Sequence, residues 1–147
     1  MVHILAPQPA HAHLPIFFNV DAAVGANAPA GAPNDIMLVQ YFLKLIGDNP
    51  GGIGAAHTAT FKKVSPTGKM DQATLDAIKA AQSVSSITPD GRVSKATGYK
   101  YGAHWFTIVD LNFSIRGRFR SAWPNVDKLP GCPPGLGLAV RQALAGS

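Results

Sequence analysis

The chain has 147 residues, of which 46% are hydrophobic and only 14% are charged. This length is enough for one domain with a genuine core, and the apolar content excludes an intrinsically disordered chain. The net charge of +5 is uneven, because residues 91–147 carry eight Lys and Arg against two Asp, whereas residues 1–90 carry five against six. The basic C-terminal part is expected to form a solvent-exposed face or to contact an acidic protein partner. No nucleic-acid-binding motif is present, so we expect no nucleic-acid partner.

Residues 1–33 are predicted to be an N-terminal arm and linker. Prolines interrupt the first apolar run and no cationic segment precedes it, so we expect no signal peptide and synthesis in the cytoplasm. No apolar run is long enough to span a membrane. Residues 16–20 read Ile-Phe-Phe-Asn-Val, which predicts a strand. His11 and His13 would share a face of a strand, but no nearby Cys or Asp completes a ligand set, so we predict no metal site.

Residues 34–46 are predicted to form the first helix, with Asn34 or Asp35 as N-cap and Gly47 as its C-terminal stop. Apolar residues at helical spacing form one stripe: Ile36, Val39, Leu43 and Ile46. Further apolar residues lie off this stripe, which predicts a contact with an arm or another subunit. Residues 48–60 are expected to be a Gly-rich loop, and no Gly-Lys-Ser/Thr follows it to bind phosphate.

A short phrase then occurs twice. Residues 68–74 read Gly-Lys-Met-Asp-Gln-Ala-Thr and residues 91–97 read Gly-Arg-Val-Ser-Lys-Ala-Thr. Each glycine follows turn-forming residues and is expected to supply a positive φ. Asp71 and Ser94 are predicted N-caps that accept a hydrogen bond from the threonine N–H three residues on. We therefore predict two equivalent turns, the first of which opens a helix over 71–83.

Residues 107–116 fit two patterns. Alternating apolar residues suggest a strand, whereas Ile108, Leu111 and Ile115 form a helical stripe; the length and the lack of a nearby partner strand favour a helix. Residues 118–147 are predicted to be a Pro/Gly-rich C-terminal arm that ends in a short helix over 136–144. The only cysteine, Cys132, lies between prolines with no His near it in sequence.

Three segments carry a family resemblance. Residues 36–47 resemble the first helix of peptidoglycan-binding domains of the three-helix type, where Gln and Gly hold fixed places in the apolar pattern. Residues 74–82 resemble that family's second helix, Thr-x-x-Ala-Val-x-x-Phe-Gln. Residues 89–97 resemble the Asp-Gly-x-Val-Gly-x-x-Thr turn that opens its last helix. The resemblance covers about residues 34–98 and departs from the pattern at three positions: Asp71 and Ser94 in place of Gly, and Ala81 in place of an aromatic residue.

The resemblance implies a mainly α fold, with a small peptidoglycan-binding-like domain over residues 34–117 that contains an internal repeat and carries extended arms over 1–33 and 118–147. It also implies a noncatalytic module that attaches to the bacterial cell wall or anchors a larger machine there. A groove for the peptidoglycan glycan or stem peptide needs polar donors and an aromatic ring. The candidates beside the repeated turn are Gln82, Asp90, Arg92, Tyr99, Tyr101 and Trp105. The chain contains no Glu and one Cys, so we expect no catalytic residues and no cofactor.

A second hypothesis is a structural subunit of a phage tail or contractile injection particle, in which the same fold serves protein–protein packing. Low charge, proline-rich arms and the widely apolar first helix favour it. In that case the protein would form part of a particle, with other protein subunits as partners. The expected interface residues are Ile16, Phe17, Phe18, Arg116, Arg118 and Arg120.

Overall fold

The computed structural model describes residues 2–5, 16–28, 32–97 and 106–146. These residues are mainly helical, as the sequence predicts. The helices are α1 (Pro33–Asp48), α2 (Ala55–Lys62), α3 (Gln72–Val84), α4 (Thr107–Arg118), the short 3-10 helix η2 (Val126–Lys128) and α5 (Pro134–Ala145). The strands are β1 (His3–Leu5), β2 (Phe17–Asn19), β3 (Val24–Gly25) and β4 (Arg92–Val93).

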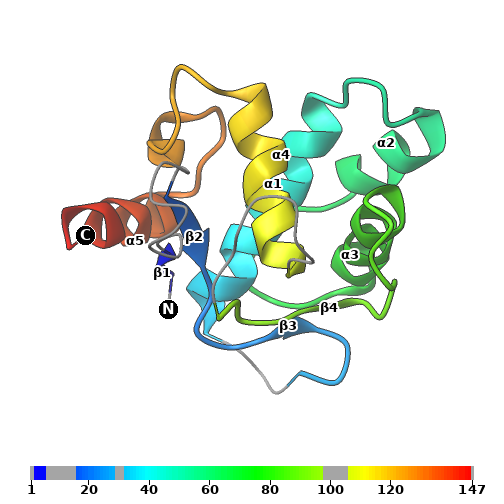
Figure 1. Cartoon of the computed structure of the whole chain (residues 1–147), viewed down its shortest axis with the longest axis horizontal. Coiled ribbons are helices and arrows are strands. Elements are labelled where there is room, and N and C mark those ends of the chain that lie inside the picture. The colour runs from blue at the N-terminus through cyan, green and yellow to red at the C-terminus, as the bar shows by residue number, and fades with distance from the viewer. Residues whose placement is uncertain (1, 6–15, 29–31, 98–105, 147) are drawn as a thin grey trace.

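Helix α1 lies at the centre of the molecule and contacts the four other α-helices (Figure 1). Its side chains are buried on nearly every side; Leu38, Val39, Phe42 and Leu43 are fully buried. The off-stripe apolar residues of this helix are therefore explained by its central position, because neighbouring helices cover each of its faces. Across the part of the chain that the structure describes, no helix has the length and apolar character that a membrane crossing requires.

Two small antiparallel sheets tie the N-terminal segment to the rest of the chain. Strand β1 pairs with β2, so that Ile4 lies opposite Phe18. Strand β3 pairs with β4, so that Gly25 lies opposite Arg92 in the second copy of the repeat. Gly25 has φ +116°, and a Cβ atom added there would lie 2.0 Å from the carbonyl oxygen of Gly91. Only glycine allows this approach of the two main chains.

The described parts of both predicted arms belong to the core. Phe17 and Phe18 are fully buried, and β2 packs against α4. Trp123 from the C-terminal segment packs edge-on against both rings, with centroid distances of 6.0 and 5.7 Å. Contrary to the expectation of a subunit interface, neither phenylalanine ring is available to a neighbouring chain in this fold.

Two buried asparagines explain why the N-terminal segment folds back. Asn112 on α4 accepts a hydrogen bond from the Phe18 N–H at 2.7 Å and donates to the Phe18 carbonyl at 2.9 Å. Asn19 pairs in the same way with both main-chain groups of Ala96, at 3.0 and 2.8 Å. Main-chain groups that would otherwise be buried without partners are thus satisfied within the chain.

Of the three arginines predicted to contact a partner, Arg118 instead makes contacts within its own chain. Arg118 donates hydrogen bonds to the carbonyl oxygens of Asn49 and Pro50 at 2.6 and 3.2 Å, so it joins α4 to the loop after α1. Ile16 and Arg116 are half-buried and Arg120 is exposed. For these three residues an interface role remains a prediction.

Helix boundaries differ from the sequence prediction at two places. Helix α1 begins at Pro33, and Asp35 accepts hydrogen bonds from the Asp21 and Ala22 N–H groups instead of capping the helix. Gly47 lies inside α1, where an added Cβ would be 2.8 Å from the Lys62 nitrogen. It therefore permits the close approach of α2, the helix that occupies the end of the predicted loop.

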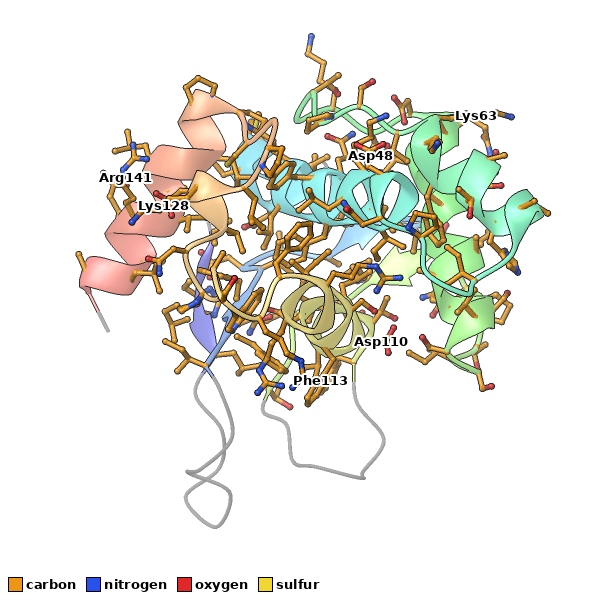
Figure 2. The ribbon with its side chains drawn as sticks, turned by 90° about the horizontal axis from the view of Figure 1, so that it is seen from above. Asp48, Lys63, Asp110, Phe113, Lys128 and Arg141 are labelled. Atoms are coloured by element: carbon orange, nitrogen blue, oxygen red, sulfur yellow. The ribbon has the colours of Figure 1, made fainter. Side chains whose placement is uncertain are left out.

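The ambiguous segment 107–116 is helical, as favoured from sequence, and it forms most of α4. Figure 2 shows Asp110 and Phe113 on this helix. Phe113 packs edge-on against Phe17 at a centroid distance of 4.6 Å. The alternating apolar residues of the segment therefore serve two faces of one helix, which packs against α1 on one side and β2 on the other.

Candidate functional site

The first repeated turn is held by a buried glutamine from α1. The Gln40 side chain accepts a hydrogen bond from the Gly68 N–H at 2.9 Å. Its amide nitrogen donates to the Lys69 carbonyl at 2.7 Å and to the Thr74 hydroxyl at 3.1 Å. We call this arrangement, in which one glutamine holds a glycine N–H, the next carbonyl and a threonine hydroxyl, the first clamp.

The second repeated turn is held in the same way by a glutamine from α3. Gln82 accepts from the Gly91 N–H at 2.9 Å and donates to the Arg92 carbonyl and the Thr107 hydroxyl, each at 3.1 Å. It also donates to Asp90 Oδ1 at 2.9 Å, a bond whose acceptor is charged. This second clamp repeats the first contact by contact, and Gly68 and Gly91 have φ values of +79° and +74°. The positive φ predicted for both glycines is confirmed.

The two copies diverge on the C-terminal side of the turn. In the first copy Asp71 caps α3 by accepting from the Thr74 N–H at 2.8 Å, as predicted. In the second copy the prediction that Ser94 caps a helix at Thr97 is wrong, because the residues that directly follow Ser94, 95–97, are not helical. Thr107, the first residue of α4, takes the place in the second clamp that Thr74 has in the first.

A pocket of about 280 Å³ lies beside the second clamp. Its wall includes Gln82 and Thr107 of the clamp itself. The polar and aromatic side chains that surround the opening are Ser86, Thr88, Asp90, Arg92, Ser94 and Phe106. This volume is close to the lower end of the range for small-ligand sites, about 300–1,000 Å³. The pocket has room for one sugar ring or a short piece of peptide.

The two charged residues of the pocket are anchored differently. Asp90 Oδ1 accepts from Gln82 and from the Arg92 main-chain N–H at 3.0 Å, so this oxygen serves the turn. Arg92 Nη1 donates to the carbonyl of Asn27 at 2.9 Å. Among the described residues, no carboxylate lies within ion-pair distance of the Arg92 guanidinium. The pocket therefore contains a cation that lacks an ionic partner there.

Half of the predicted ligand-binding residues come together at this pocket. Gln82, Asp90 and Arg92 line it, although Gln82 is 1% exposed and uses its amide to hold the turn. Tyr99, Tyr101 and Trp105, and also the pair His11 and His13, lie outside the described residues. The sequence analysis missed the hydroxyls of Ser86, Thr88 and Ser94 and the ring of Phe106. Their proximity to the repeated turn was the available signal.

A second hollow, of about 30 Å³, lies between α1, α3 and α4. Ser85 donates to Asp110 Oδ2 at 2.7 Å on its wall, and burial raises the pKa of the Asp110 carboxyl. This space suits a single water and not a ligand. Elsewhere, Asp127 and Arg141 pair at 3.5 Å and join η2 to α5 at the edge where Figure 2 labels Lys128 and Arg141.

The described residues include no group of three or more His, Cys or Asp side chains placed to hold a metal ion. Comparison of the chain with models of protein families, with curated proteins and with solved structures finds no match. The function must therefore be inferred from the chemistry of the pocket and from the arrangement of the repeat.

Proposed function

We propose that this protein is a noncatalytic module that binds bacterial peptidoglycan, with the pocket beside the second clamp as its ligand site. The observation that carries the proposal is the lining of that pocket. Hydroxyl groups, one arginine, one aspartate and the half-buried ring of Phe106 surround a space for one small group. Ligand sites commonly combine an apolar surface with a few polar groups that fix orientation.

The family resemblance supports the same proposal. Its motif positions include Gln40, Gln82 and Gly91, and these residues form the two clamps. The clamps hold turns in place and leave their neighbouring side chains, Lys69 and Arg92, at equivalent positions. The clamps thus hold the main chain of each turn by hydrogen bonds beneath a different side chain in each copy, an arrangement that suits recognition.

The pocket also favours binding over catalysis. Neither histidine nor cysteine is among the described residues that line it, and the one carboxylate there, that of Asp90, uses an oxygen to hold the turn. One argument for the alternative role in a phage tail or injection particle was an apolar arm that could contact a neighbouring subunit. Because Phe17 and Phe18 are buried in their own chain, that argument is weakened.

Cosedimentation with purified sacculi tests the proposal. We expect the unmodified protein to sediment with sacculi without releasing soluble fragments, and Arg92→Ala to reduce the bound fraction. Lys69→Ala is the matched control, because Lys69 occupies the same place in the first copy and is exposed. Far-ultraviolet circular dichroism and thermal unfolding check that both variants fold.

Two results would overturn the proposal. If the unmodified protein stays in the supernatant, peptidoglycan is not its ligand. If it sediments but Arg92→Ala and Lys69→Ala bind as well as it does, the second-copy pocket is not the binding site.

A further inference from the structure

We infer that the pocket beside the second clamp takes the peptide part of peptidoglycan through a free carboxylate, and not the glycan strand; this inference rests on the wall-binding function proposed above. The first observation is the state of Arg92. Arg92 lines the pocket, and its guanidinium donates to one carbonyl oxygen in an exposed contact and has no carboxylate within ion-pair distance among the described residues. Its remaining donors are therefore accessible to an anionic group of a ligand.

The chemistry of the guanidinium favours a carboxylate. Arginine presents five N–H donors in a planar fork that matches two carboxylate oxygens at once. The contact with Asn27 accounts for one nitrogen, Nη1. Charge-assisted bonds of this kind are roughly twice as strong as bonds between neutral groups. In peptidoglycan that carries its peptides, the lactyl carboxyl of each muramic acid is consumed in the amide bond to the peptide, so the glycan strand is neutral there and would leave the charge of Arg92 uncompensated.

Asp90 also favours a peptide as the ligand of this pocket. One of its carboxylate oxygens is held by Gln82 and the Arg92 N–H, yet the residue as a whole is exposed at the pocket. A purely anionic ligand would be repelled by this carboxylate. A short peptide carries N–H or ammonium donors next to its carboxylates, so it offers a partner to both charged residues.

The hydroxyl groups that line the pocket are also suited to binding a peptide. The hydroxyls of Ser86, Thr88 and Ser94 can each donate one hydrogen bond and accept others, as required to pair with the amide groups on either side of a carboxylate. The volume of about 280 Å³ admits the end of a peptide rather than a long segment.

Isothermal titration with three probes tests the inference. The probes are a stem tetrapeptide with free carboxylates, the same peptide amidated at every carboxyl group, and a neutral oligosaccharide of N-acetylglucosamine. We expect the free peptide to bind, and amidation or Arg92→Gln to weaken binding roughly tenfold or more. Lys69→Gln should bind as the unmodified protein does, and Arg92→Lys should recover part of the affinity because it restores the charge without the fork.

The outcomes separate the inference from the proposed function. Equal binding of free and amidated peptides by the unmodified protein, or binding of the neutral oligosaccharide in place of peptide, overturns the carboxylate assignment even if sacculi are still bound. If neither the probes nor whole sacculi bind, the wall-binding function itself falls. The probe comparison uses the unmodified protein, so it holds whether or not an Arg92 variant folds.

Discussion

Replacing Gln82 by alanine should destabilise the protein strongly, because this one side chain holds the second turn. The substitution removes one accepted hydrogen bond and the two amide hydrogens that Gln82 shares between three acceptors. Each bond between neutral groups contributes about 0.5–1.5 kcal/mol net, and a buried N–H left without a partner costs about 1–3 kcal/mol. Gly91, whose N–H would lose its acceptor, is buried. We therefore expect the free energy of unfolding to fall by about 3 kcal/mol.

Urea unfolding followed by circular dichroism measures this change, and the melting temperature should fall by about 6–12 °C for a domain of this size. Gln72→Ala is the matched control on the same helix. Gln72 is exposed and donates only to Asp76, four residues on, so its loss should cost no more than about 0.5 kcal/mol. If Gln82→Ala is as stable as Gln72→Ala, the clamp does not hold the turn.

Three further predictions concern other contacts. Gly25→Ala should cost at least about 2 kcal/mol because of its positive φ and the main-chain contact opposite it, whereas Gly52→Ala, with no atom within 4 Å, should be neutral; similar unfolding curves would contradict this reasoning. Asn112→Ala removes both hydrogen bonds to the Phe18 main chain and should lower the free energy of unfolding by about 2–4 kcal/mol, and a loss below about 0.5 kcal/mol would refute its role. Burial, and secondarily a nearby aspartate, raises the pKa of the Cys132 thiol to about 11. Alkylation of this thiol at a pH of about 8 should therefore be roughly 100-fold slower in the folded than in the unfolded protein, and equal rates would contradict the raised pKa.

The raised pKa of Cys132 also predicts how the stability of the fold depends on pH. The folded state favours the protonated thiol, so this contribution is complete below the ordinary thiol pKa, about 8.5, and is lost as the pH rises towards 11. Stability should therefore decline over this alkaline interval, and Cys132→Ser should show a smaller decline. Tyr41, whose pKa is also raised by burial, contributes in the same direction.

Some local signals predicted the local structure correctly, although the caps expected at Asn34 or Asp35 and at Ser94 did not form. The Asp71 cap depends on a contact three residues away, and the positive φ of Gly68 and Gly91 depends on the turns that contain them. For the cap and the two turns, the deciding interaction lies within a few residues of the position that predicts it. The periodicity of 107–116 fitted both a helix and a strand, and the length and the lack of a nearby partner strand favoured the helix that forms.

Long-range pairing could not be read in the same way. Thr97 follows the second turn at the same spacing as Thr74 follows the first, yet the clamp takes Thr107, because the tertiary position of α4 decides which threonine meets Gln82. The apolar residues near Phe17 predicted burial correctly, but composition does not say whether the covering surface belongs to the same chain.

The candidate site was predicted in part for the same reason. Asp90 and Arg92 lie within the repeated turn, so the motif marked them directly. Ser86 follows α3 and Phe106 precedes α4, and only the packing of these two helices brings both residues to one pocket. When a site is formed by the ends of several helices and turns, the sequence predicts only those of its residues that belong to a recognisable motif.

The most direct test of the account is a two-dimensional amide NMR titration of the unmodified protein with soluble peptidoglycan fragments. The two copies serve as site and internal control in a single spectrum. We predict that the amide signals of Gly91, Arg92 and Thr107 shift in a saturable manner, whereas those of Gly68 and Lys69 stay in place. Equal shifts in both copies, or saturable shifts confined to residues far from the second clamp, would contradict the assignment of the pocket as the ligand site.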